Sequence, residues 1–390
     1  MNPRREAVFI LARWLESGDF PDRMLTAGPS RAFVQNAVYT AIRNRTALLW
    51  ILGQHLRRLP SGELLAVLLL GATELLFLEC RAPYAAVNEA VGVAKIASRR
   101  TAGVVNAVLR RIAEGREELL ANLAKQRPSI RFSHPSVLIR RWSEQFGESA
   151  ALEICRLDNL PAETWLASLD PNAPRRFERL ERGIDPAGVP ELVSGKAIVQ
   201  DPATAAAIDL LNIQDGQRIL DSCAAPGGKT LQIAVRNPHG QTVAADLHED
   251  RLSALRQNLE RTRLQTVEVL RLSADVERPD GIFDRILLDV PCSNTGVLRR
   301  RPDARWRWSP ARLSKLLERQ AAILENTAQA LAPQGRLVYS TCSLEPEENQ
   351  LQVRRFVDTH PGWRLVEERQ FLPHLQGHDG AYAAALMRAD

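Results

Sequence analysis

The stretch RILDSCAAPGGKT, residues 218–230, decides how the second half of this chain folds. It starts with an apolar run of strand length that ends in Asp221, and it passes through two glycines into a helical pattern. Similar apolar runs follow at 242–246, 267–270, 285–289 and 335–340, with helical stretches at 229–236, 249–263 and 310–332. Strands that alternate with helices predict a parallel sheet covered on both faces, with ligands at the carboxyl ends of the strands.

The pattern is different toward the N-terminus. Residues 1–127 show only helical spacing, broken by short turn sequences, and predict an all-α domain. Residues 128–200 are interrupted by prolines and glycines, and we expect a small α/β connector domain there. Residues 201–390 complete the chain as the α/β domain. A length of 390 residues fits this multidomain α plus α/β organisation, because one core rarely grows beyond about 250–300 residues.

Composition excludes several classes of protein. The chain is 45% hydrophobic and 25% charged, as globular proteins are, and it lacks an apolar run of the roughly 18–20 residues that span a bilayer. It has five cysteines without a CxxC pair, namely Cys80, Cys155, Cys223, Cys292 and Cys342. This pattern argues for the reducing cytoplasm and against disulfides and a metal site. We expect a cytoplasmic protein with no membrane contact.

The positive charge is concentrated at the front of the chain. Residues 1–130 contain 18 Lys and Arg against 11 Asp and Glu, whereas the rest contains 33 against 35. This imbalance makes the helical region the expected contact for a polyanion. Nearly all of the cations are arginines, which suit phosphate recognition, although a GC-rich genome gives the same bias.

The glycine turn at 227–228 has two interpretations. The sequence Gly228-Lys229-Thr230 matches the end of a phosphate-binding P-loop, but Cys223 stands where its first glycine belongs. An adenosine cofactor without a pyrophosphate instead predicts an acidic residue at the end of the next strand.

Two aspartates occupy the positions that the second interpretation requires. Asp246 ends the next strand, nineteen residues past Gly227. Asp275 follows the third strand, where it either contacts an adenine amino group or caps a turn.

The fourth and fifth strands each end in a polar turn that contains a cysteine. Cys292 lies in LLDVPCSNTG and Cys342 in YSTCSLEPEEN, so we expect both at one edge of the sheet. Neither has a histidine nearby in sequence, which gives little support to a Cys–His hydrolase. The two cysteines are fifty positions apart, so they do not form a redox CxxC pair either.

A cysteine thiolate can also add to C6 of cytosine, which makes C5 able to accept a methyl group. Asp289, at the end of the fourth strand, is placed to engage cytosine N3 or N4. Lys229 is placed to orient this carboxylate and to favour a thiolate by its charge.

These motifs resemble those of the RNA cytosine-C5 methyltransferases that use S-adenosyl-L-methionine. DSCAAPGGKT is similar to the cofactor loop of that family, DVPCSNTG to its first cysteine motif and YSTCSLEPEEN to its second. Residues 81–112 resemble the NusB-like helical RNA-binding domain of the bacterial ribosomal RNA small subunit methyltransferase B family. The resemblance implies a NusB-like N-terminal domain and a Rossmann-like catalytic domain.

The resemblance also implies roles for individual residues. Cys342 is the expected nucleophile, and Cys292 is expected to assist breakdown of the covalent adduct. The cofactor is expected to contact Cys223, Ala224, Ala225, Pro226, Gly227, Gly228, Lys229, Asp246, Asp275 and Asp289. Asn294 departs from the family, in which glycine is common; asparagine also tolerates a positive φ.

The segment after the first cysteine motif is rich in arginine and tryptophan. We expect RNA contacts from Arg299, Arg300, Arg301 and Arg305, with Trp306 and Trp308 either stacking on bases or filling the core. A cytosine must leave its stack to react, so a locally single-stranded rRNA segment is the expected substrate.

The domain combination favours small-subunit (16S) rRNA over tRNA. A P-loop NTPase and a non-catalytic RNA-associated factor remain alternatives. We expect a monomer.

Overall fold

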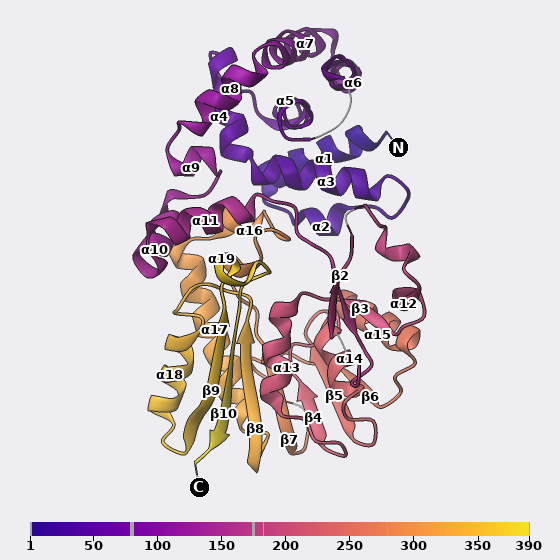
Figure 1. The fold of residues 1–390 in the computed structure, drawn as a ribbon, viewed down its shortest axis with the longest axis vertical. Coiled ribbons are helices and arrows are strands. Elements are labelled where there is room, and N and C mark those ends of the chain that lie inside the picture. Colours follow the sequence, from indigo (N-terminus) through magenta and orange to yellow (C-terminus); the bar gives the residue numbers. More distant parts are fainter. Residues whose placement is uncertain (1, 79–81, 174–175, 182, 279, 390) are drawn as a thin grey trace. The chain divides into compact units, whose positions relative to one another are not determined.

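The protein is described here by a computed structural model that covers residues 2–78, 82–173, 176–181, 183–278 and 280–389. Its contacts divide the chain into two compact units (Figure 1). Unit 1 comprises Met1–Pro161 and Leu298–Arg307, and unit 2 comprises Ala162–Val297 and Trp308–Asp390. Cys80 lies outside the described residues.

Unit 1 is built from helices. They are α1 (Pro3–Ser17), α2 (Pro21–Met24), α3 (Arg31–Arg43), α4 (Arg45–His55), α5 (Gly62–Leu76), α6 (Pro83–Ala97), α7 (Arg99–Glu114), α8 (Arg116–Ala124), α9 (Pro128–Arg131), α10 (Ser136–Phe146), α11 (Glu148–Asp158) and α16 (Ala304–Arg307). Proline at the first helical position and a capping Asn2 side chain start α1, and Gly18 in the left-handed conformation ends it.

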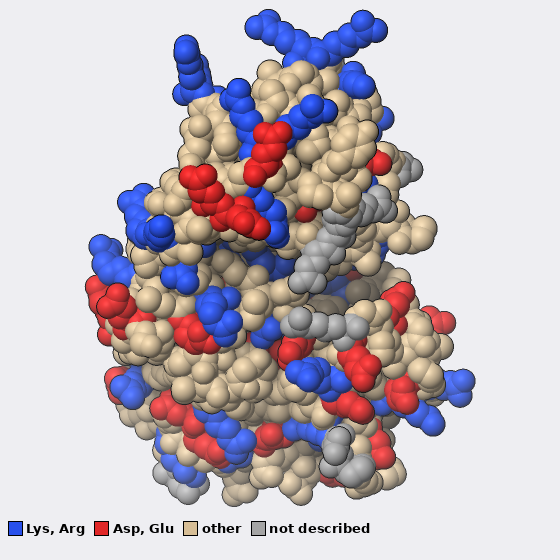
Figure 2. All heavy atoms as spheres, turned by 45° about the horizontal axis from the view of Figure 1, so that its top comes forward, with Lys and Arg blue, Asp and Glu red and all other residues tan. Residues whose placement is uncertain are grey.

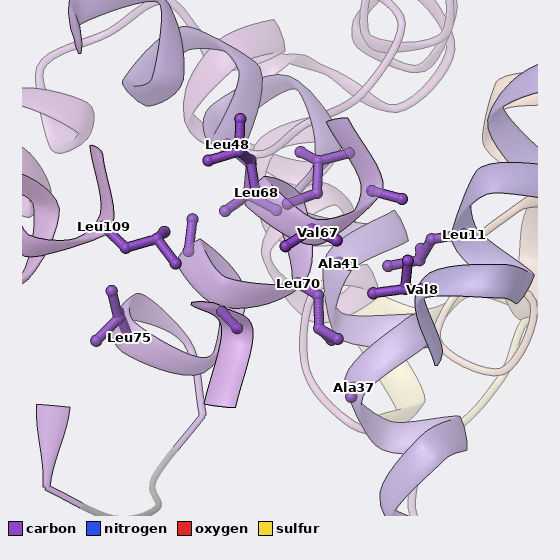
Figure 3. Close-up of a cluster of buried hydrophobic side chains, with 14 of the residues drawn as sticks. Val8, Leu11, Ala37, Ala41, Leu48, Val67, Leu68, Leu70, Leu75 and Leu109 are labelled. Atoms are coloured by element: carbon purple, nitrogen blue, oxygen red, sulfur yellow. The ribbon is translucent and has the colours of Figure 1, made fainter. Parts of the chain in front are cut away.

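The core of unit 1 surrounds α5, which is apolar over most of its circumference. Figure 3 shows side chains of α1, α3, α4 and α7 packed around Val67, Leu68 and Leu70 of α5. Gly71 allows α7 to approach closely, since a Cβ at this position would lie 2.4 Å from Leu109 Cδ1. The predicted all-α organisation of this region is confirmed.

A segment from the second half of the chain completes unit 1. We call Leu298–Arg307 the strap. Arg43 Nη2 of α3 donates to the Arg299 carbonyl oxygen at 2.6 Å, and Trp306 Nε1 donates to the Ile42 carbonyl oxygen at 3.0 Å. The chain therefore leaves unit 2 after Val297 and returns to it at Trp308.

Unit 2 contains two sheets. The large sheet has the order β6-β5-β4-β7-β8-β10-β9, and a small antiparallel sheet has the order β2-β1-β3. The strands are β1 (Trp165–Ser168), β2 (Phe177–Arg179), β3 (Ala197–Val199), β4 (Arg218–Asp221), β5 (Gln241–Asp246), β6 (Val267–Arg271), β7 (Phe283–Asp289), β8 (Leu331–Thr341), β9 (Trp363–Phe371) and β10 (Ala381–Arg388). Strands β4 to β8 are parallel, and β10 is antiparallel to β8 and β9.

Helices cover both faces of the large sheet (Figure 1). Ile219, Leu287 and Val338 pack on the side of α13 (Ala205–Leu211) and α14 (Gly228–Ala234), and α15 (Glu249–Thr262) packs beside α14. Leu288 and Tyr339 pack on the side of α17 (Pro310–Ala328) and α18 (Gln350–Thr359). The remaining short elements are η1 (Pro186–Gly188), α12 (Pro190–Val193), η2 (Pro202–Thr204), η3 (Thr295–Val297) and α19 (Pro373–Gln376).

The five strands predicted from apolar runs all form: β4 has its expected bounds, and the other four lie within four residues of theirs. The β9–β10 hairpin was not predicted, because β9 is mostly polar and has no fully buried residue that would make an apolar run. The domain boundaries also differ from those expected. Helices α9 to α11 of the expected connector pack in unit 1, whereas its strands β1 to β3 belong to unit 2.

None of the helices in the described part of the chain combines the length and apolar character needed to cross a membrane.

Candidate active site

The glycine turn joins β4 to α14 at the carboxyl edge of the large sheet. Gly227 has φ 106°, and a Cβ there would lie 2.4 Å from Leu255 Cδ1 of α15, so this position requires glycine for two reasons. Gly228 begins α14. The turn therefore brings bare backbone to the edge of the sheet, as the sequence predicts.

Asp221 ends β4 beneath this turn and is buried. Thr230 Oγ1 donates to its Oδ2 at 2.7 Å, whereas no described group donates to its Oδ1. Burial, reinforced by the charges of Asp289 and Asp246, raises the pKa of Asp221 to about 7. A ligand that offers hydrogen-bond donors would satisfy the open oxygen.

Asp246 ends β5 next to the glycine turn. Its carboxylate accepts hydrogen bonds from the backbone amides of Ala225 at 3.2 Å and His248 at 3.1 Å. Arg251 Nη1 lies 3.3 Å from Asp246 Oδ2. Asp246 thus lies at the strand end that a ribose-binding acid requires, and it also fixes the turn itself.

Asp275 lies in the turn after β6. Ser273 Oγ donates to its Oδ1 at 2.6 Å, and Arg319 Nε lies 3.3 Å from its Oδ2. The hydrogen bond from Ser273 and the charge of Arg319 lower the pKa of Asp275. These contacts agree with a turn-capping role and leave adenine contact as a prediction.

Lys229 and Asp289 form an ion pair between the glycine turn and the end of β7. Lys229 Nζ lies 2.6 Å from Asp289 Oδ2, and Ser340 Oγ of β8 donates to Asp289 Oδ1 at 2.8 Å. Burial opposes charge on Lys229, but Asp289, Asp221 and Cys342 raise its pKa. Lys229 is therefore protonated and lies near Cys342.

The two motif cysteines meet as the strand order predicts, because β7 and β8 are neighbours. Cys292 Sγ lies 3.3 Å from Cys342 Sγ, and both residues are half-buried. Cys342 Sγ donates to Asn294 Oδ1 at 3.3 Å. Asn294 has φ 63°, which confirms that this asparagine takes the left-handed conformation open to glycine.

The cysteines of unit 2 differ in their electrostatic surroundings. The hydrogen bond with Cys342, burial and the charges of Cys342 and Glu348 raise the pKa of Cys292 well above its usual value. Burial and three nearby aspartates raise the pKa of Cys223. Cys342 instead lies close enough to Lys229 for its charge to act on the Lys229 ammonium.

Sequence reasoning missed the polar residues that hold the cysteine turns. Ser293, Ser343 and Glu348 form a buried hydrogen-bonded cluster between the turns. The only signal for this cluster was the density of hydroxyl and acidic residues in the two motifs.

The expected RNA contacts of Arg299 and Arg305 need correction. Arg305 is 0% exposed and its guanidinium donates to Asn159 Oδ1 at 2.7 Å and to the Asp158 carbonyl oxygen at 3.1 Å. Arg299 is 6% exposed and donates to the Pro161 carbonyl oxygen. Both arginines hold the strap in unit 1, so direct RNA contact remains a prediction only for Arg300 and Arg301.

The tryptophans of this segment follow the core alternative. Trp306 packs against the core of unit 1, and Trp308, in unit 2, is 8% exposed.

The two P-loop side chains, Lys229 and Thr230, are bonded to Asp289 and Asp221. Three carboxylates at the strand ends disfavour a triphosphate, whereas they suit a ligand with hydroxyl and ammonium donors. The open oxygen of Asp221 and the glycine turn therefore fit S-adenosylmethionine. Within the described ranges, no cluster of His, Cys, Asp and Glu is arranged to hold a metal ion.

Comparison with known proteins agrees with this site. The family described as 16S rRNA methyltransferase RsmB/F matches residues 208–387, and the NusB family matches residues 1–114. Ribosomal RNA small subunit methyltransferase B of Vibrio cholerae serotype O1 is 38% identical, with 83% of this chain and 80% of the relative covered. The same-named protein of Serratia proteamaculans is 32% identical, with 92% and 90% covered.

Solved structures share the fold. The crystal structure of PH0851 matches with a TM-score of 0.80 at 21% identity, and the match covers 100% of this chain and 99% of that chain. The glycine turn, the paired cysteines and relatives matched over 80–90% of their length lead to one conclusion: this chain belongs to the ribosomal RNA small subunit methyltransferase B family, within the RsmB/F methyltransferases.

Proposed function

We propose that this protein transfers a methyl group from S-adenosylmethionine to C5 of a cytosine in 16S rRNA, through a covalent bond between Cys342 Sγ and cytosine C6. The observation that carries the proposal is the 3.3 Å approach of two sulfurs beside the Lys229–Asp289 pair. A single pyrimidine ring can reach all of these groups from the carboxyl edge of the sheet.

Cys342 acts as the nucleophile because, of the two paired cysteines, it is the one that lies beside the cation of the site. The Lys229 ammonium is the neighbouring cation, whereas Cys292 lies beside the Glu348 carboxylate. The Cys342 thiolate adds to C6, and the ring electrons move toward C5 and N3. Asp289, oriented by Lys229 and Ser340, engages the N3/N4 edge of the base by accepting from N4, and the Lys229 ammonium balances the negative charge that develops toward N3.

Cys292 serves the second half of the reaction. After C5 has gained its methyl group, the C5 proton leaves to a base and the C6–sulfur bond breaks, which returns the Cys342 thiolate. Cys292 remains a neutral thiol at 3.3 Å from Cys342, where it assists this release.

The glycine turn holds the cofactor. When bound, S-adenosylmethionine supplies the electrophilic methyl group. The backbone of residues 223–228 surrounds one side of the site, Asp246 accepts the ribose hydroxyls, and Asp275 contacts the adenine. The position of Asp246 at the end of β5 supports this assignment.

Unit 1 supplies the contact with RNA. On its α6 and α7 helices, Lys95, Arg99, Arg100, Arg110 and Arg111 are exposed. Figure 2 shows basic side chains gathered over part of unit 1 and charges of both signs mixed over unit 2. Such a surface binds phosphates without reading the base sequence. The target cytosine lies in a locally single-stranded segment, because the base must leave its stack to reach Cys342. We propose that the protein acts as a cytoplasmic monomer.

The test is a methyl-transfer assay with labelled S-adenosylmethionine. Unmodified 16S rRNA and bulk tRNA are supplied separately, and the digested RNA is analysed for 5-methylcytidine. We expect label in 16S rRNA with the wild-type protein and none with Cys342→Ala. A matched control is Cys155→Ala, which removes a buried cysteine of unit 1.

Other outcomes separate the alternatives. Label in tRNA alone would show that tRNA is the substrate in place of 16S rRNA and would leave the proposed mechanism of methyl transfer unchanged. ATP hydrolysis without methyl transfer would support the NTPase, and RNA binding without either activity would support a non-catalytic factor.

A further inference from the structure

Glu348 connects the turns that carry the two cysteines. It lies between β8 and α18 and is 0% exposed. Its Oε1 accepts the backbone amide of Ser293 at 2.8 Å, and its Oε2 accepts Ser343 Oγ at 2.5 Å and also Ser293 Oγ. Ser293 directly follows Cys292 and Ser343 directly follows Cys342, so one carboxylate reaches the neighbours of both thiols.

Glu348 is itself held firmly. Gln320 Nε2 of α17 donates to Glu348 Oε1 at 2.9 Å and to the Pro291 carbonyl oxygen at 3.0 Å. Tyr339 Oη of β8 donates to the Glu348 carbonyl oxygen at 2.7 Å. The carboxylate is therefore fixed to α17 and the backbone of Glu348 to β8, and the two cysteine turns are hydrogen-bonded to this carboxylate.

This arrangement is costly for stability alone. The donors to the Glu348 carboxylate named above are a backbone amide, a side-chain amide and hydroxyls, all of them neutral. A buried carboxylate whose donors are all neutral loses hydration that these donors repay only in part. A carboxylate in this position is explained better by a requirement of the site than by the fold.

We propose that Glu348 is a positioning residue of the two-cysteine site, whose carboxylate sets the spacing and orientation of the Cys292 and Cys342 turns. Its role in methyl transfer rests on the proposed function, whereas its effect on the spacing of the thiols does not. Its negative charge also lies beside Cys292 and favours the neutral thiol there.

Two substitutions separate position from charge. Glu348→Gln and Glu348→Ala both remove the charge, but glutamine keeps an oxygen for the Ser293 amide and for Gln320, and its amide group can donate to the hydroxyls. The difference between the two variants therefore reports positioning. Glu325→Gln is the matched control, because Glu325 is an exposed glutamate of α17.

The readout is the rate at which Cys292 and Cys342 form a disulfide. The oxidant is diamide: the two thiols lose two protons and two electrons, which reduce the diazene to a hydrazine. Peptide mapping by mass spectrometry identifies the linked pair. We expect Glu325→Gln to match wild type, and Glu348→Ala to form the disulfide at least tenfold more slowly than Glu348→Gln.

Equal rates for Glu348→Ala and Glu348→Gln would overturn the proposal. If Glu348→Ala does not fold, Ser343→Ala tests the proposal instead, because it removes one donor to Glu348 and keeps the carboxylate charge. An unchanged rate of disulfide formation in Ser343→Ala would also overturn the proposal. The same proteins are then assayed for methyl transfer. We expect kcat to fall about 100-fold in Glu348→Ala, with the KM for S-adenosylmethionine unchanged. An inactive wild type would refute the proposed function while the disulfide rates still decide the role of Glu348.

Discussion

Arg305 gives a sharp test of the correction to its expected role. An RNA contact and a structural role make opposite predictions for Arg305→Ala. If Arg305 bound phosphate, the variant would keep its stability and lose RNA affinity. The structure instead places the guanidinium, fully buried, among acceptors of α11 and the turn before α10. We therefore expect a loss of stability in unit 1.

The size of the loss follows from the contacts. The hydrogen bonds to Asn159 Oδ1 at 2.7 Å and to the Asp158 carbonyl oxygen at 3.1 Å are well formed. Each is worth about 1.5–3 kcal/mol because the donor is charged. Burial lowers the pKa of Arg305 to about 10, so part of this gain offsets desolvation of the cation. A net loss of about 3 kcal/mol is expected, equivalent to roughly a 100-fold change in an equilibrium constant.

Hydrogen exchange measured by mass spectrometry locates the effect. We expect amides of α10 and α11 to exchange about 100-fold faster in Arg305→Ala, with protection in β7 and β8 unchanged. Arg110→Ala, which truncates an exposed arginine of α7, is the control and should leave exchange unaltered. Unchanged exchange in Arg305→Ala together with weaker RNA binding would refute the structural assignment.

Three further predictions concern pH, the ion pair and RNA. Burial, with the charge of Arg305, lowers the pKa of His134 to about 4; the unfolded state then binds this proton first, so the contribution of His134 to stability falls by about 1.4 kcal/mol per pH unit as pH drops from about 6.5 to 4. Because the raised pKa of Asp221 acts in the opposite direction, the quantity to measure is the difference in unfolding free energy between wild type and His134→Gln in urea from pH 7 to 4, which should have this slope; a difference that does not change with pH would contradict the assignment. Lys229→Met leaves Asp289 without its cation, so the rate of single-turnover methyl transfer should fall at least 100-fold. RNA affinity measured by filter binding should not change, and a near-normal rate would contradict a role of the ion pair in methyl transfer. Charge reversal of Arg99 and Arg100 should weaken RNA binding at least tenfold, and the slope of log affinity against log salt concentration should fall by the equivalent of about two phosphate contacts. Cofactor affinity measured by calorimetry should stay the same; an unchanged salt slope would mean that the RNA binds elsewhere.

The parallel half of the sheet was predictable because its signals are local. The runs that end at Asp221, Asp246 and Asp289 are buried on both faces, so they read as continuous apolar stretches with a polar residue at the edge. The meeting of Cys292 and Cys342 followed from the shared edge of neighbouring strands. Most residues of the candidate site were therefore predicted from their positions at the ends of strands.

The parts that were not predicted depend on contacts between distant segments. The strap joins unit 1 through bonds such as Arg43 to Arg299, which are 256 residues apart, and a window of sequence cannot show that an arginine-rich run is buried. Glu348 was hidden for a related reason: its importance comes from reaching Ser293, 55 residues away. Burial of polar groups is the feature that single-sequence reasoning misjudged in both cases.

The central claim is that Cys342 forms the bond to the cytosine ring. We expect Cys292→Ala to slow release, so incubation with unmodified 16S rRNA and S-adenosylmethionine should leave a protein–RNA adduct that survives denaturation. Mass spectrometry of nuclease- and protease-treated adduct identifies the modified cysteine. We expect a methylated cytidine attached to the peptide that contains Cys342. The double variant, which carries Cys292→Ala and Cys342→Ala, should form no adduct. An adduct on another cysteine, or methylation of 16S rRNA at normal rate by Cys342→Ala, would contradict the mechanism.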